Sequence, residues 1–326
     1  MPQLRKNIIT GEWLILAPER AQRPDDYIRS GRMKRSDKSK CPFCPGGEAF
    51  KNSIKDAETE NIYVVPNKYP AFVTSINGND SKSYRVEDSF YFVKHALGGH
   101  EVINIKNHDL EPFQFSTSLT QELFEVFQNR YLFYKKDKIN EYAMAIYNHG
   151  PESGATLDHP HAQLFVSSIV PNYILRELHG SENYYNTNGS CVFCDMVKHE
   201  HHERVRVLAE NDDFILFTFF AARFPFEMWV LPKQHESQFE KVGKDVLKNL
   251  AIILNKVFVM LDKTLNDPPF NFFIHNLPNT MKSCSFYHWH IEITPRLSNY
   301  GGYELGSGNV IDIVAPEKAA EFLKKE

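Results

Sequence analysis

Short apolar runs alternate with polar loops along the first half of the chain. Residues 9–16 predict a strand around a Gly-Glu-Trp turn, and a loop rich in proline and charge follows it. Residues 120–136 have the apolar spacing of an amphipathic helix. Further strands are predicted at 62–65, 89–93, 101–105, 142–147 and 162–170.

The same order of elements recurs in the second half. Strands are predicted at 214–218, 227–231, 271–275 and 288–294, with a helix at 246–264. His108 precedes His159 by about fifty residues, and His235 precedes His288 by a similar interval, as expected of a duplicated unit. Each half would pack as an antiparallel sheet with a helix on it. We therefore predict an α+β fold with two related halves, residues 1–178 and 179–326.

Composition limits the classes of partner. The chain has 326 residues, of which 42% are hydrophobic and 24% charged, so it can bury a substantial core. A formal net charge of -4 gives no cationic surplus for nucleic acid, although a nucleotide needs only a few local cations. The sequence starts without the apolar region of a signal peptide and has no run long enough to span a bilayer. We expect a cytoplasmic protein with no nucleic-acid or membrane partner.

Four of the five cysteines form two C-x-x-C pairs. Each pair offers two thiolates on one turn, and two distant histidines would complete a tetrahedral Cys₂His₂ zinc site. The alternative is that these cysteines are buried apolar residues or a redox pair. A closed four-ligand site would be structural. The expected ligands are Cys41, Cys44, His108 and His159 in the first half and Cys191, Cys194, His235 and His288 in the second. We interpret the run at 199–202 as a solvated helix face rather than a metal site.

The densest chemistry lies in the run Asp-His-Pro-His-Ala-Gln at 158–163. On a strand, His159, His161 and Gln163 point to the same side. A neutral His161 with one free ring nitrogen can attack phosphorus. Gln163 cannot exchange protons near neutral pH, but its NH₂ group can donate to a phosphoryl oxygen, which favours a covalent intermediate over hydrolysis. The alternative for His161 is a hydrogen-bonded core histidine.

These residues resemble the histidine-triad superfamily, in the branch of galactose-1-phosphate uridylyltransferase and ADP-glucose phosphorylase. The branch signature His-Pro-His-x-Gln matches residues 159–163, and the resemblance covers nearly the whole chain. It implies two histidine-triad-like halves, His161 as nucleophile, both histidine ligands of the first zinc site, and a homodimer whose partner contributes to the site. The substrate-binding residues that it implies are Arg20 and Arg23 at the phosphates, Asn67 at the nucleoside, Asn148, Gly154 and Thr156 at the diphosphate, and Tyr303 and Glu304 at the hexose.

Two features depart from the uridylyltransferase pattern. The second C-x-x-C set looks more like the two-zinc arrangement of the ADP-glucose phosphorylases, and iron is the alternative metal there. After Glu304 the chain reads Leu-Gly-Ser-Gly, without the glutamine that contacts the sugar in uridylyltransferases. In the second half, Glu292 stands where Gln163 would be, so we expect His290 to be non-catalytic.

The resemblance implies a ping-pong nucleotidyltransferase. Its partners would be a nucleotide sugar and hexose 1-phosphate, and it would move the nucleoside monophosphate through nucleotidyl-His161. Three alternatives remain: adenylyl transfer from ADP-glucose or a diadenosine polyphosphate, a nucleotide hydrolase of the same superfamily, and a zinc-stabilised interaction module without catalysis.

Overall fold

The computed structural model describes residues 1–20, 27–33, 37–74, 90–91 and 93–325. The strands are β1 Gln3–Lys6, β2 Trp13–Leu16, β3 Ile62–Pro66, β4 Gly98–Ile105, β5 Tyr142–His149, β6 His161–Ser167, β7 Val207–Glu210, β8 Phe214–Thr218, β9 Met228–Pro232, β10 Phe270–His275, β11 His290–Pro295 and β12 Ile311–Asp312. The α-helices are α1 Thr117–Lys135, α2 Asn172–Asn188, α3 Val192–Glu203, α4 Lys244–Leu265, α5 Gly302–Ser307 and α6 Pro316–Leu323. Short 3₁₀ turns include η1 Pro18–Arg20 and η7 Pro151–Ser153.

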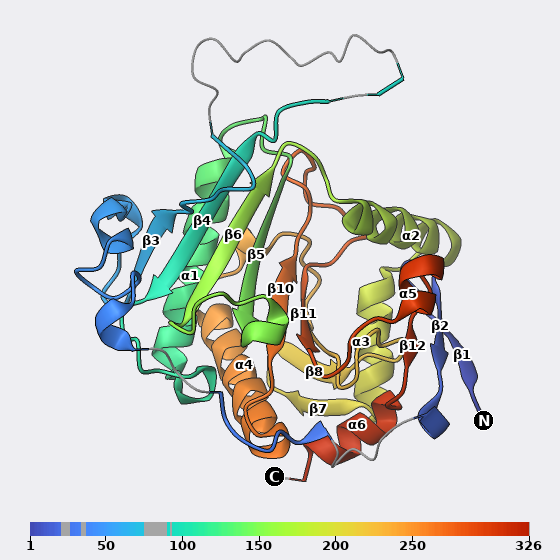
Figure 1. Ribbon diagram of the computed structural model, residues 1–326. Coiled ribbons are helices and arrows are strands. Elements are labelled where there is room, and N and C mark those ends of the chain that lie inside the picture. The colour runs from blue at the N-terminus through green and yellow to red at the C-terminus, as the bar shows by residue number, and fades with distance from the viewer. Residues whose placement is uncertain (21–26, 34–36, 75–89, 92, 326) are drawn as a thin grey trace.

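A nine-stranded sheet runs through both halves in the order β3-β4-β6-β5-β10-β11-β9-β8-β7 (Figure 1). Every neighbouring pair in it is antiparallel. The order β3-β4-β6-β5 in the first half corresponds to β8-β9-β11-β10 in the second, and β5 pairs with β10 where the halves meet. This repeat confirms the predicted α+β fold of two related halves, which share one continuous sheet.

One face of the sheet is covered by helices along its whole width. Alternate apolar residues of the strands, such as Leu164 on β6 and Ile293 on β11, join a single core with α1 and α4. The two helices also pack against each other. Because side chains alternate along a strand, the residues between them face the opposite side of the sheet. His161 and Gln163 are on that opposite side.

The opposite face is covered unevenly. In the second half, Phe217 and Trp229 pack under Leu178 of α2 and Phe193 of α3. In the first half, the apolar cover found among the described residues is the segment around Phe43 and Phe50, which packs on Tyr63, Val65 and Val102 of β3 and β4. Phe43 also contacts the ring of His161 at the start of β6, with ring centroids 5.3 Å apart.

A second, three-stranded sheet has the order β1-β2-β12. It joins the N-terminal segment to the C-terminal one, since β12 pairs in parallel with β2. The short helix α5 precedes β12 and lies on the right of Figure 1, whereas β6 lies left of centre. In the described part of the chain, no helix has the length and apolar character needed to cross a membrane.

Two of the predicted elements differ from the structure. The predicted strand at 9–16 is strand only from Trp13, and residues 8–10 form a turn after β1. The prediction of a strand at 89–93 is wrong for the described residues Phe90, Tyr91 and Val93, which are exposed and lie outside any strand. An apolar run forms a strand only where a neighbouring strand pairs with it, and local sequence does not supply that neighbour.

Candidate active site

His161 is the first residue of β6, and its ring is buried. Its Nδ1 lies 2.8 Å from the carbonyl oxygen of His159. A carbonyl oxygen only accepts, so Nδ1 carries the proton and Nε2 keeps its lone pair. Burial lowers the pKa of His161, which keeps the imidazole neutral. The arrangement provides an uncharged nitrogen nucleophile.

Gln163, two residues further along β6, is held by a residue that the sequence analysis missed. Its Oε1 lies 2.8 Å from Nε2 of His100 on β4. The backbone N–H of Ala71 donates to Nδ1 of His100 at 3.1 Å, so the proton of a neutral His100 is on Nε2 and is donated to Gln163. Burial lowers the pKa of His100, which favours this neutral form. The NH₂ group of Gln163 is left to donate to a substrate.

Asn67 follows β3 and lies beside this pair. Its Oδ1 accepts the backbone N–H of Tyr69 at 2.9 Å, and its Nδ2 lies 3.1 Å from Nε2 of His100. Because Nε2 of His100 donates to Gln163, this second contact is not a hydrogen bond, and Asn67 lies beside the pair on the same side of the sheet as His161.

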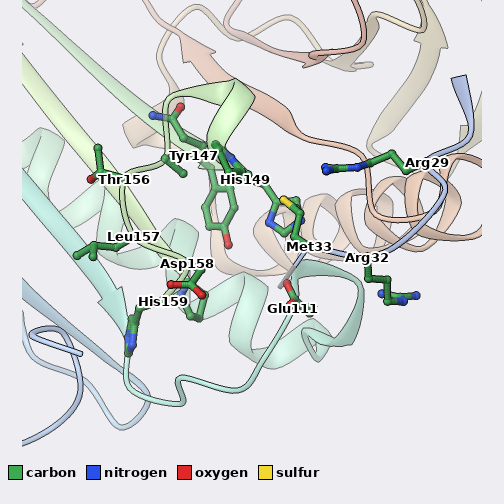
Figure 2. A pocket seen from close by; sticks show the side chains of 15 residues that line it. Arg29, Arg32, Met33, Glu111, Tyr147, His149, Thr156, Leu157, Asp158 and His159 are labelled. Atoms are coloured by element: carbon green, nitrogen blue, oxygen red, sulfur yellow. The ribbon is translucent and has the colours of Figure 1, made fainter. Parts of the chain in front are cut away.

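Asn148 lies near the end of β5, and the loop that follows carries Gly154 and Thr156. Gly154 has φ 90°, ψ 11°, a left-handed conformation that glycine adopts without strain. Both Gly154 and Thr156 are exposed. A cavity of about 510 Å³ lies beside this loop, and its lining includes Asn148, Thr156, Arg29 and Arg32. Figure 2 shows the two arginines across the cavity from Thr156.

The two arginines of that cavity are already paired. Arg32 Nη2 lies 2.7 Å from a carboxylate oxygen of Asp262, and Arg29 Nη2 lies 3.7 Å from Glu152. The pairing with Asp262 raises the pKa of Arg32. Because both charges are balanced within the chain, the cavity has less attraction for phosphate than two unpaired arginines would give.

The four expected ligands of the first half converge on one point. Cys41 Sγ lies 3.5 Å from His159 Nδ1, and Cys44 Sγ lies 3.5 Å from His108 Nδ1. The four ligand atoms all lie within 4.8 Å of one another. His159 Nε2 donates to the carbonyl of Ile105 at 2.7 Å, so its Nδ1 presents a lone pair to the centre of the group. Burial, together with the neighbouring Cys41, raises the pKa of Cys44 to about 11, so two thiolates here need a cation.

The second set converges in the same way. Cys194 Sγ lies 3.3 Å from His235 Nδ1 and 3.7 Å from His288 Nδ1, and all four ligand atoms again lie within 4.8 Å. Cys191 is the N-cap residue of α3, and Cys194 lies in the first turn of that helix. His235 Nε2 donates to the carbonyl of Cys284 at 2.9 Å, which leaves Nδ1 free to bind a metal. The donor set fits a closed tetrahedral zinc site.

His290 occupies the position in β11 that His161 occupies in β6. Its Nδ1 donates to the carbonyl of His288 at 3.1 Å, as His161 does to His159. Phe193 of α3 contacts its ring, as Phe43 contacts the ring of His161, but the His290 ring is also stacked on Trp229, with ring centroids 4.7 Å apart. These contacts bury His290 completely, so no substrate reaches it.

Acidic side chains fill the space next to His290. Its Nε2 lies 3.7 Å from Oε1 of both Glu177 and Glu292, and this carboxylate environment raises the pKa of His290 to about 9 against the effect of burial. His275 Nδ1 completes the group, 3.1 Å from Glu177 Oε1. Arg223 forms an ion pair with Glu292. The sequence analysis missed this cluster, because its members are scattered through α2, β10 and β11 without a recognisable spacing.

The remaining predicted substrate residues lie elsewhere on the chain. Arg20, Tyr303 and Glu304 line a separate cavity of about 610 Å³ beside the three-stranded sheet. Glu304 Oε2 accepts the backbone N–H of Gly301 at 2.9 Å, at the start of α5. In Figure 1, α5 lies away from β6, so one chain does not bring these three residues to His161. Arg23 lies outside the described residues.

The galactose-1-phosphate uridyl transferase N-terminal domain matches residues 1–171, and the C-terminal domain of the same family matches residues 177–325. The chain belongs to the galactose-1-phosphate uridyl transferase family. It is 30% identical to an ADP-glucose phosphorylase of Arabidopsis thaliana, over 99% of this chain and 93% of that protein. It is 25% identical to a galactose-1-phosphate uridylyltransferase of Thermotoga maritima, over 100% of this chain and 98% of that protein.

Solved structures of the family agree with this assignment. A crystal structure of an ADP-glucose phosphorylase from Arabidopsis thaliana with bound ADP-glucose superposes with a TM-score of 0.82 and 28% identity, covering 100% of this chain and 99% of that one. The family membership and the fold predicted from the sequence are thereby confirmed. The protein is an enzyme, a nucleotidyltransferase of the hexose-1-phosphate uridylyltransferase type.

Proposed function

We propose that this enzyme moves a nucleoside monophosphate from a nucleoside diphosphate hexose to hexose 1-phosphate through a covalent intermediate on His161, within galactose metabolism. His161 Nε2 attacks the α-phosphorus, the bond from that phosphorus to the bridging oxygen breaks, and hexose 1-phosphate leaves with the bonding electrons. In the second step an oxygen of the acceptor phosphate attacks the same phosphorus, and neutral His161 departs. The hydrogen bond from His161 Nδ1 to the carbonyl of His159 is the observation that carries this proposal.

Hydrogen-bond donors on the same face support the transfer. The NH₂ group of Gln163 is positioned by His100. Asn148 lies on β5, which pairs with β6, and the exposed loop around Gly154 follows β5. Such donors stabilise charge that develops on phosphoryl oxygens in the transition state. Because Gln163 supplies no proton near neutral pH, the covalent intermediate persists until an acceptor arrives, which argues against a hydrolase.

A specific observation favours a second candidate, adenylyl transfer from ADP-glucose to phosphate. The Arabidopsis thaliana ADP-glucose phosphorylase is 30% identical over 99% of this chain, and a structure of that enzyme holds ADP-glucose. The second Cys₂His₂ set agrees with the two-zinc pattern expected of that group. Both candidate activities use the same covalent mechanism. They differ in the base of the nucleotide, uracil or adenine, and in the acceptor, hexose 1-phosphate or phosphate.

We further propose that a second copy of the chain completes the site. Arg20, Tyr303 and Glu304 lie together on an exposed cavity away from β6, and a homodimer would bring them to the hexose end of a substrate on the partner. Arg23 is assigned to the same phosphate-binding segment. We place the enzyme in the cytoplasm, with residues 1–178 as the catalytic domain and 179–326 as the C-terminal domain.

We also propose a structural zinc ion at each Cys₂His₂ set, with iron as the alternative at the second. His159 would be held in place as a ligand of the first zinc, and its carbonyl orients His161 by accepting the Nδ1 proton. The donor sets of two thiolates and two imidazoles support zinc over harder metals.

The test is covalent labelling without acceptor. The purified protein is incubated with ADP-glucose or UDP-glucose, each carrying ³²P in its α-phosphate, and acid-labile label is mapped by peptide. We expect label on His161, loss of label in His161→Asn, and retention in His201→Asn, a matched control at an exposed histidine on α3. Label from UDP-glucose supports the uridylyltransferase, and label from ADP-glucose supports the phosphorylase. Full turnover by His161→Asn contradicts the mechanism.

A further inference from the structure

The second half of the chain contributes a polar residue, Asn271, to the side of the sheet on which His161 lies. Asn271 on β10 stands directly opposite Asn148 on β5, at the junction of the two halves. Its Nδ2 lies 2.7 Å from Oδ1 of Asn148 and 2.8 Å from the backbone carbonyl of Ser153. One amide group thus holds both the end of β5 and the turn η7 in the loop before His161.

These contacts fix which way both amides face. The carbonyl of Ser153 only accepts hydrogen bonds, so the atom of Asn271 next to it is the NH₂ group. An NH₂ group 2.7 Å from a second NH₂ group would be repulsive, so the Asn148 atom facing Asn271 is its oxygen. The NH₂ group of Asn148 therefore points away from Asn271. Within the described chain, that NH₂ group donates to no protein atom, and Asn148 is only half-buried.

We propose that Asn271 is a positioning residue that keeps the NH₂ group of Asn148 directed at the phosphate oxygens of the substrate. Phosphoryl oxygens are anionic acceptors, so Asn148 assists transfer only when it presents its NH₂ group and not its carbonyl. His100 orients Gln163 in the same way, because it donates a hydrogen bond to the oxygen of that amide and leaves the NH₂ group for the substrate. This inference rests on the proposed function, because it needs a phosphate beside Asn148.

The position of Asn271 also explains what the second half adds to catalysis. Gly150 and Gly154 both have positive φ, so the loop between β5 and β6 is shaped by residues without a side chain to anchor it. The carbonyl of Ser153 lies inside this loop and is tied to β10 by Asn271. A rigid strand of the other half is a more precise anchor than a contact within the loop.

The proposal is tested by the single-turnover rate of His161 labelling in a double-mutant cycle. Asn271→Ala should slow labelling by about 10-fold to 100-fold, since a displaced donor loses much of its effect in the transition state. In the Asn148→Ala background, the same substitution should slow it by no more than about threefold, because the group that it positions is already absent. Asn271→Asp, which keeps the shape but has no NH₂ group to donate, should be at least as slow as Asn271→Ala.

The control is Asn255→Ala on α4. Asn255 Nδ2 donates to the carbonyl of Phe115 and its Oδ1 accepts from Thr120, so this variant also loses two hydrogen bonds, but on the helix side of the sheet. It should lower the melting temperature without slowing labelling. Asn271→Ser, which removes the amide without introducing a charge, keeps the test available if the aspartate variant does not fold.

Three results overturn the inference, and they are distinguishable. A wild-type labelling rate in Asn271→Ala shows that Asn271 does not position a reactive group. Equal losses in the wild-type and Asn148→Ala backgrounds show that Asn271 acts independently of Asn148. Absence of label on wild-type His161 from both nucleotide sugars refutes the proposed function itself, and the inference then falls with it.

Discussion

Asp312 provides a test of how a buried carboxyl limits the stability of this fold. It lies on β12 with 1% of its surface exposed, and its Oδ1 accepts the backbone N–H of Val314 at 3.0 Å. Its Oδ2 is buried without a hydrogen-bond partner in the described chain. Burial raises the pKa of Asp312 from 3.8 to about 7, and the nearby Glu227 carboxylate adds to the shift. The folded protein therefore keeps a proton that the unfolded chain releases.

The sign of the pH effect follows from that difference. Below pH 3.8 both states are protonated, and Asp312 carries no penalty. As pH rises from 3.8 towards 7, only the unfolded chain ionises, and folding loses about 1.4 kcal/mol per pH unit. Asp312→Asn resembles the protonated carboxyl and does not titrate. Relative to wild type, it should gain about 3 kcal/mol between pH 5 and pH 8.

The measurement is urea denaturation of wild type and Asp312→Asn at pH 5 and pH 8. For a chain of this length, a gain of that size corresponds to about 4 °C in melting temperature. The exposed Asp245→Asn on α4 is the matched control for loss of one surface carboxyl. If the free-energy difference between Asp312→Asn and wild type is the same at both pH values, Asp312 is ionised in the folded state and the reasoning is wrong.

Further expected outcomes concern the site, the metals and the core. His100→Phe removes the donor to Gln163 Oε1 and should slow His161 labelling about tenfold, with unchanged labelling refuting the role of His100. Cys194→Ser should lose one metal equivalent per chain by elemental analysis while the other is retained, and an unchanged metal content would exclude a site there. Arg130→Met leaves the buried Glu101 carboxylate without its cation and should lower the free energy of unfolding, measured by urea denaturation, by about 3–5 kcal/mol. A decrease below about 1 kcal/mol would contradict this.

Local sequence pattern was sufficient for the elements whose apolar residues match a regular period. The structure confirms strands at the predicted 214–218 and helices close to 120–136 and 246–264. The strand β1 was missed because its sequence Gln-Leu-Arg-Lys is mostly polar, and it is held by pairing with β2. Helix α2 was missed because its last turns are polar and its apolar face is short.

The candidate site was predictable only where one motif carries several groups. His161 and Gln163 share a strand, so their common side follows from alternation alone. His100 and Asn271 reach the same face from other strands, and their positions depend on the strand order β4-β6-β5-β10. No spacing along the chain encodes that order. Their contribution therefore became visible only with the sheet.

The comparison of His161 with His290 shows what separates the two halves chemically. Both follow a histidine of a Cys₂His₂ set by two residues, and both donate Nδ1–H to that histidine's carbonyl. Both rings are therefore held in the same tautomer, with a proton on Nδ1. Phe43 packs on His161 much as Phe193 packs on His290, so what differs is that His290 also stacks on Trp229 and has the carboxylate of Glu177 beside it. The neighbouring carboxylates raise the pKa of His290, whereas burial without a carboxylate lowers the pKa of His161, and this difference supports our proposal that only His161 acts as the nucleophile.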